Sequence, residues 1–247
     1  MNLSARRSAV CALASLLVLG LCVPVTLSQR GSKNVPVKNA KRANDAERHS
    51  SDSAKVFSQI MDTPDKGIPK NLLDKAEAIG VFPGITKAGF IVGGRGGQGV
   101  ISRRIKGGWS APAFFNVGGA DFGAQIGVEK IDAVLLFMND DAVAGLLKDK
   151  LELGGELSAT AGPVGRTASA STDVLLRAGI LSYSRTKGLF AGAVLKGASI
   201  SPDNDLNEAV YGLDAKDLLT GGEKMTMAQV PTVVRVFPIT LARYSNR

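Results

Sequence analysis

The stretch from Ala78 to Met138 decides the fold, because it is a series of short apolar or alternating runs separated by glycines. The runs are AIGVF (78–82), KAGFIVGG (87–94), GQGVISRRI (97–105), SAPAFFNVGG (110–119), DFGAQIGVEK (121–130) and IDAVLLFM (131–138). Each is too short and too rich in glycine for a helix, and they recur at roughly ten-residue spacing, so each predicts a β-strand. No helix of crossover length separates neighbouring runs, which favours an antiparallel sheet over parallel βαβ winding.

Further strand-like runs follow this stretch, and helical patterns flank it on both sides. The strand-like runs cover residues 151–161, 165–171, 173–185 and 188–201. Apolar spacing and capping residues predict helices at 50–61, 71–79, 142–148, 207–211 and 215–219. The last stretch, 232–244, is ambiguous because Pro238 argues against one continuous element. The predicted fold class is α+β and mainly β: a glycine-rich, largely antiparallel sheet, curled or barrel-like, with short helices at both ends.

The N-terminus has the layout of a secretory signal peptide. Arg6 and Arg7 precede an uncharged stretch whose apolar centre is AVCALASLLVLGLCVPV (9–25). Small residues before position 29 favour cleavage after Ser28, so residues 1–28 are interpreted as the signal peptide. One alternative is a lipoprotein signal that ends in lipidation of Cys22, although such signals favour a small residue just before the cysteine and Leu21 is large. Another alternative is an uncleaved anchor helix. In each case we expect an exported protein that is periplasmic, envelope-associated (including as an outer-membrane lipoprotein) or secreted.

The formal net charge of +8 is concentrated near the N-terminus. Residues 1–28 carry +2 and residues 29–50 carry +4, which leaves +2 on residues 51–247. We interpret residues 29–50 as a basic flexible linker that is either simply solvated or attracted to an anionic lipid surface. Residues 51–247 are predicted to form the globular domain, and its balanced charge argues against nucleic-acid binding.

The inventory of reactive side chains argues against an enzyme. His49 is the single histidine, and the two cysteines, Cys11 and Cys22, both lie in the apolar N-terminal segment. A Ser-His-Asp or Cys-His nucleophile and a histidine- or cysteine-based metal site therefore lack their parts. We expect no catalytic residues, no metal site and no cofactor.

Two motifs resemble ligand-binding signatures, but their surroundings favour structural roles. Residues 94–99 spell G-x-G-x-x-G, yet the following residues alternate like a strand, so the helix that a nucleotide site needs is missing and a glycine-rich hairpin or bulge explains them better. Residues 203–207 begin like a calcium loop, but Glu208 stands where that loop needs glycine. An aspartate cap before a short helix is the better interpretation.

A basic cluster surrounds the single tryptophan. It consists of Arg95, Arg103, Arg104 and Lys106 near Trp109. On a strand, Arg103 and Arg104 point to opposite faces. A cationic edge beside an interfacial tryptophan suits a lipid headgroup surface, whereas the alternative is a solvated hairpin with Trp109 as a core anchor.

An ordered series of motifs resembles the SYLF domain, a family also described as lipid-binding or actin-binding. The motifs are KAGFIVGGRGGQGVISRR (87–104), GGWSAPAFF (107–115), GAQIGVE (123–129), LGGELSATAGPVGR (153–166) and YSRTKGLFAGAVLKG (183–197). The resemblance covers about Ala54 to Gly212. It implies a non-enzymatic lipid-binding module. It also implies phosphoinositide binding through a basic amphipathic N-terminal helix and, in some eukaryotic members with SH3 or FYVE domains, actin binding. Bacterial members are signal-bearing envelope proteins.

This chain departs from the eukaryotic pattern, so we expect an anionic phospholipid surface as its partner and do not expect actin or a nucleotide. It has a secretory signal and no SH3 or FYVE partner, and its matching helix is less basic. Lys55, Phe57 and Ile60 of that helix are the predicted lipid contacts, together with the basic cluster and Trp109. The alternative is a structural or protein-interaction component of the envelope, in which Phe57 and Ile60 belong to the core.

Overall fold

The computed structural model describes residues 40–63, 67–154, 159–165, 178–186, 189–192, 195, 197–220 and 224–245. All of them belong to one compact unit, Ser32–Arg247. The predicted signal peptide with Cys22, residues 29–39 of the predicted linker and the run at 166–171 lie outside the described residues.

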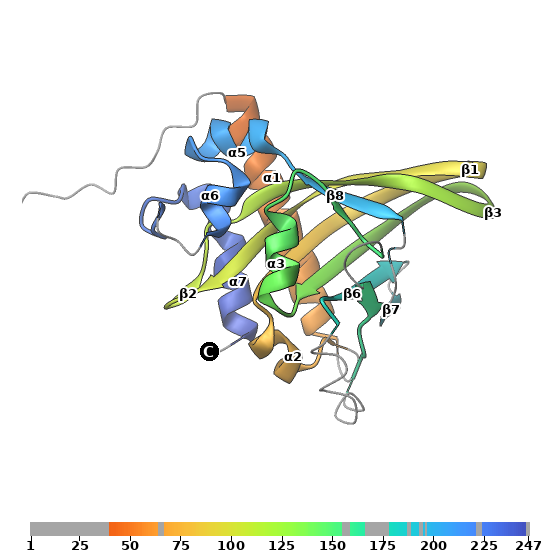
Figure 1. The fold of residues 1–247 in the computed structure, drawn as a ribbon, viewed down its shortest axis with the longest axis horizontal. Helices are drawn as coiled ribbons and strands as arrows, with labels where there is room; N and C mark the ends of the chain where they lie inside the picture. The colour runs from red at the N-terminus through yellow and green to blue at the C-terminus, as the bar shows by residue number, and fades with distance from the viewer. Residues whose placement is uncertain are drawn as a thin grey trace, which may run out of the picture. The chain divides into compact units, whose positions relative to one another are not determined.

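Two long strands form the centre of the sheet. β1 spans Ala78–Ile105 and β3 spans Ala113–Phe137, and they pair antiparallel from Ala78 opposite Phe137 to Ile101 opposite Ala113 (Figure 1). The short β2, Gly108–Trp109, folds back onto the end of β1. The prediction of six short strands was therefore wrong in length. Glycines do not end these strands, because glycine tolerates the bulges and bends that a long curled strand needs.

Shorter strands extend the sheet on the far side of β3. β6, Ile180–Thr186, pairs with the last part of β3, and β8, Ala198–Pro202, pairs with its first part. β7, Leu189–Gly192, pairs with β6, and β4, Leu151–Glu152, pairs with β8. β5, Ala159–Ala161, runs parallel to β6, and every other pairing among the described strands is antiparallel. The strongly curled, mainly antiparallel sheet confirms the predicted fold class (Figure 1).

Helices from both ends of the chain cover the sheet. The first is α1, Ala40–Met61, followed by α2, Lys70–Lys75, and α3, Asp140–Leu146. The C-terminal part contributes α5, Asn204–Tyr211, α6, Ala215–Leu219, the 3-10 turn η2, Thr232–Val234, and α7, Val236–Tyr244. α1 packs against both β1 and α7, so the main core lies between the sheet and this pair of helices. None of the described helices is long and apolar enough to span a membrane.

α1 starts ten residues before the predicted helix. Residues 40–50, which the sequence assigns to the linker, are the first part of α1. Its buried face in this part consists of Ala46, His49 and Ser50, which are small or polar. The apolar spacing that predicts a helix is therefore weak here, although the face is buried.

The capping predictions are confirmed at two helices. The Asn139 side chain accepts a hydrogen bond from the Ala142 N–H at the start of α3. The Asp203 side chain accepts a hydrogen bond from the Leu206 N–H at the start of α5. The motif that begins like a calcium loop is therefore a helix cap, as predicted. Pro238 is also accommodated, because it is the third residue of α7, where the N–H that it lacks has no helical partner.

Candidate functional site

A polar groove lies beside the N-terminal half of α1. It consists of two hollows of about 530 and 230 Å³. Both are lined by Arg48, His49 and Gln98, so they adjoin along α1. The larger hollow is also lined by Asp52, Pro83, Gly84, Thr86, Gly96, Gly97, Asn116 and Val117, and the smaller one by Lys41, Arg42, Asp45, Asp203 and Leu206.

The floor of the larger hollow is the glycine-rich part of the β1–β3 ladder. Gly97 lies opposite Val117, and Gln98 lies opposite Asn116. A Cβ at Gly97 would come within 3.1 Å of the Ile85 Cα, so a side chain at this position would crowd the backbone. The G-x-G-x-x-G motif lies inside the regular β1–β3 ladder, so it is part of a strand and not the hairpin or bulge that the sequence favours. It leaves backbone exposed beside the amides of Gln98 and Asn116.

The α1 wall of the groove carries three cations, Lys41, Arg42 and Arg48, and the ion pairs of the two arginines are exposed to solvent. Arg48 forms an ion pair with Asp45 at 2.9 Å, and its side chain stays 60% exposed. Arg42 lies 3.9 Å from Asp205, which is 87% exposed. Exposed pairs of this kind contribute at most about 1 kcal/mol, so an incoming anion can compete for these guanidinium groups.

His49 is buried between α1 and the sheet, at the boundary of both hollows. Burial lowers its pKa, and the nearby Arg48 charge lowers it further, while Asp45, Asp203 and Asp52 act in the opposite direction. Its ring lies 6.5 Å from that of Phe114, centroid to centroid. His49 is therefore neutral at pH 7 and can offer a hydrogen bond without adding positive charge.

The predicted lipid contacts on α1 are divided between core and surface. Phe57 and Ile60 have no exposed surface. The Phe57 ring packs against the ring of Tyr244 on α7, with 5.8 Å between the ring centroids. Lys55 is exposed on the outer face of the helix. Lipid contact by Phe57 or Ile60 would require α1 to leave the sheet.

The basic cluster around Trp109 is mostly engaged in internal contacts. The Arg104 guanidinium lies 4.2 Å from the centre of the Trp109 ring and donates hydrogen bonds to the carbonyl oxygens of Leu73 and Ala76. Trp109 is 3% exposed, and its indole N–H donates to the Ser245 hydroxyl. In this arrangement, Arg104 and Trp109 connect β1 and β2 to α2 and to the C-terminus.

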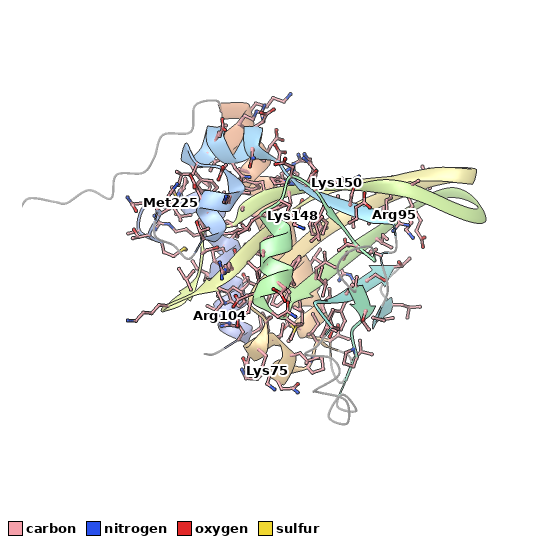
Figure 2. All side chains as sticks on the ribbon, in the orientation of Figure 1. Lys75, Arg95, Arg104, Lys148, Lys150 and Met225 are labelled. Carbon is pink, nitrogen blue, oxygen red and sulfur yellow. The ribbon has the colours of Figure 1, made fainter. Side chains whose placement is uncertain are left out.

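The other members of the cluster lie apart. The Arg103 side chain leaves β1 on the face opposite to that of Arg104. It donates a hydrogen bond to the Leu219 carbonyl oxygen and forms an ion pair with Asp140 at 3.3 Å. Lys106 is exposed in the turn between β1 and β2. Arg95 lies nine residues before Arg104 on β1, about 30 Å along an extended strand, and Figure 2 shows the two well separated. The structure does not gather these residues into one site.

Sequence reasoning missed the groove because its lining comes from separate elements. Gln98 and Asn116 meet only through the β1–β3 register. Arg48 and His49 join them because α1 begins before its predicted start. The position of the single histidine was visible in the sequence, but nothing there linked it to the glycine-rich strand. No group of three or more potential metal ligands is found among the described side chains.

Comparisons with known proteins agree with the motif series. Residues 118–237 match the family model described as "Ysc84: Las17-binding protein actin regulator". SH3 domain-containing YSC84-like protein 1 of Xenopus laevis is 36% identical over 153 residues, which cover 61% of this chain and 45% of that protein. LAS seventeen-binding protein 3 of Saccharomyces cerevisiae is 38% identical over 163 residues, which cover 64% of this chain and 35% of that protein.

The human protein of the same name as the Xenopus relative is 33% identical over 187 residues, covering 74% of this chain and 54% of that protein. The chain thus spans about half the length of these relatives or less. The family match extends from within β3 to the start of α7. The resemblance seen in the motifs is confirmed: residues 118–237 carry a match to the Ysc84 (SYLF) domain, and the relatives include YSC84-like proteins.

Proposed function

We propose that this protein is a non-enzymatic module that binds anionic phospholipid at a membrane surface. The observation that carries the proposal is the smaller hollow of the groove beside α1, which is lined by three cations, Lys41, Arg42 and Arg48, and by two acids, Asp45 and Asp203. The third acid of the groove, Asp52, lines the larger hollow. A phosphate ester accepts charge-assisted hydrogen bonds from guanidinium groups.

The larger hollow supplies groups for the uncharged part of a headgroup. The amides of Gln98 and Asn116 and the hydroxyl of Thr86 line it together with exposed glycine backbone. These groups can donate to and accept from hydroxyl and ester oxygens. The groove thus offers cations for phosphate beside neutral polar groups for glycerol or a polyol.

The proposed location is outside the cytoplasm, in or at the cell envelope. Its support is the layout of residues 1–28, with cleavage after Ser28 favoured over lipidation at Cys22. The intact mass of the mature protein tests this location. A chain that starts at Gln29 supports a free form, a diacylated Cys22 supports a tethered form, and an unprocessed N-terminus would contradict processing by a signal peptidase.

Vesicle co-sedimentation of the chain from Gln29, which contains the whole compact unit, tests lipid binding. We expect the protein to sediment with vesicles that contain phosphatidylglycerol, and little of it to sediment with vesicles of pure phosphatidylcholine. Arg48→Gln should weaken binding, whereas Lys216→Gln, an exposed cation on α6, is the matched control. Equal loss in both variants would favour a diffuse charge effect and contradict the groove as the binding site.

A second candidate function is actin regulation through binding to actin filaments. The observation that favours it is the family description, together with a yeast relative named for binding Las17. Sedimentation with actin filaments separates the two candidates. Under the phospholipid proposal the protein stays in the supernatant, and saturable pelleting with filaments would favour the second candidate.

A further inference from the structure

We propose that the exposed face of η2 and α7 is the surface that docks on the anionic bilayer; this inference rests on the proposed function. It places the apolar membrane contact on the C-terminal helix and not on α1, whose large apolar side chains are buried. We call this exposed face, formed by Val233, Val236, Ile239 and Arg243, the α7 face.

Exposed aliphatic side chains are concentrated on the α7 face. Val233 is 41% exposed, Val236 39% and Ile239 56%. Among the described residues only two other large hydrophobic side chains are exposed, Val128 and Leu189, and they lie on the strands β3 and β7. Residues 233, 236 and 239 are each three positions apart, which places them along one side of a helical segment. An apolar stripe of this kind marks a contact surface.

The opposite side of the helix is fixed firmly to the rest of the molecule. Val234, Phe237 and Leu241 have no exposed surface. At the start, the Ser50 hydroxyl of α1 donates to the Val234 carbonyl at 2.7 Å. At the end, the Tyr244 hydroxyl donates to Asp62 at 2.7 Å. The outward stripe therefore belongs to a well-packed helix and is not the unburied half of a loose one.

The charge around the stripe complements an anionic surface. The segment from Lys224 to Ser245 contains no Asp or Glu and carries three cations. Lys224 pairs with Asp217, and the Arg235 guanidinium donates to the carbonyl oxygens of Val230 and Ala228, so Arg243 is the cation that faces solvent beside the stripe. Arg243 is exposed in the last turn of α7, four residues after Ile239 and on the same side of the helix. Aliphatic side chains flanked by cations suit the boundary between headgroups and acyl chains.

The composition of the α7 face favours a bilayer over a protein partner. The exposed hydrophobic residues on it are two valines and an isoleucine, without an aromatic anchor. Protein interfaces instead concentrate their binding energy in Trp, Tyr and Arg that fill pockets. A stripe of short aliphatic groups on the outside of a helix can enter the headgroup region along its length.

The test compares two double variants of the chain from Gln29. Val236→Ser with Ile239→Ser removes two of the three aliphatic side chains of the stripe, and Val128→Ser with Leu189→Ser removes two exposed aliphatic side chains elsewhere. Flotation with mixed phosphatidylcholine–phosphatidylglycerol vesicles should show about ten-fold weaker binding for the first variant and unchanged binding for the second. Thermal unfolding of both variants checks their folding.

Hydrogen exchange of the unaltered chain, with and without these vesicles, gives a second readout that does not depend on any variant. Protection by vesicles should appear at residues 232–244. Vesicle binding without that protection, or with equal affinities for the two variants and the parent chain, would overturn the α7 inference and leave the proposed function in place. A parent chain that binds no anionic vesicles would overturn both.

Discussion

At the scale of single residues, Phe57 distinguishes a core position from a lipid contact. Its ring is fully buried against α7 and the sheet. We expect Phe57→Ala to lower the free energy of unfolding by about 3–5 kcal/mol, because the loss of a buried ring leaves a cavity. Urea unfolding measures this change. Lys55→Gln on the exposed face should leave stability nearly unchanged, and a Phe57→Ala chain as stable as the parent would contradict the burial.

His49 gives the stability a predictable pH dependence. Its pKa in the folded chain lies below the ordinary value of 6.5, so below that pH the unfolded chain binds a proton that the folded chain resists. Stability from this group is fully present above 6.5 and is lost as the pH falls through that value. Denaturant unfolding at about pH 7.5 and about pH 5 should show lower stability at the acidic pH.

The matched variant for this prediction is His49→Gln, which removes the titrating group and keeps a polar side chain. The difference in stability between the two pH values should become smaller in the variant. An unchanged difference would show that the pH dependence of the stability does not come from His49.

At the scale of elements, the two glycines Gly96 and Gly99 on β1 should differ sharply. A Cβ at Gly99 would collide with the Val81 carbonyl oxygen and with Phe82, whereas a Cβ at Gly96 would meet nothing within 4 Å. Gly99→Ala should therefore lower the unfolding free energy by about 1–3 kcal/mol, and Gly96→Ala should change it little. Thermal or urea unfolding of the two variants provides the measurement, and equal stabilities would contradict the close packing at Gly99.

The sequence predicted the types of element better than their lengths. Short apolar runs such as KAGFIVGG and IDAVLLFM identify strands correctly, but the glycines between the runs lie inside β1 and β3 and do not end these strands. The start of α1 was missed because Ala46, His49 and Ser50 form a buried face without large apolar residues. Local capping chemistry at Asn139 and Asp203 was predictable, since it depends on only a few neighbouring residues.

The candidate site was less predictable than the fold, because it depends on contacts between distant parts of the chain. The sequence placed Phe57 and Ile60 on one helical face, but it could not tell whether that face meets lipid or α7. Similarly, Arg104 and Trp109 were recognised as neighbours, whereas their contacts with α2 and Ser245 required the tertiary structure. Periodicity identifies an apolar face and leaves its partner open.

At the scale of the whole molecule, we propose two kinds of contact with a membrane. The groove beside α1 provides hydrogen bonds and charge for a headgroup, and the α7 face provides aliphatic surface. The first contact depends on the ionic strength, because salt screens exposed charges over about 10 Å at 0.1 M and about 3 Å at 1 M. The second depends mainly on the apolar area that enters the lipid.

The most direct test of the central claim is vesicle flotation of the chain from Gln29 across a series of salt concentrations, with phosphatidylcholine vesicles that either contain or lack phosphatidylglycerol. We expect the chain to float with the anionic vesicles at low salt, the floating fraction to fall steeply as salt rises, and little protein to float with the neutral vesicles. A folded chain that stays at the bottom of the gradient with anionic vesicles at low salt, or that floats equally with both kinds, would contradict it.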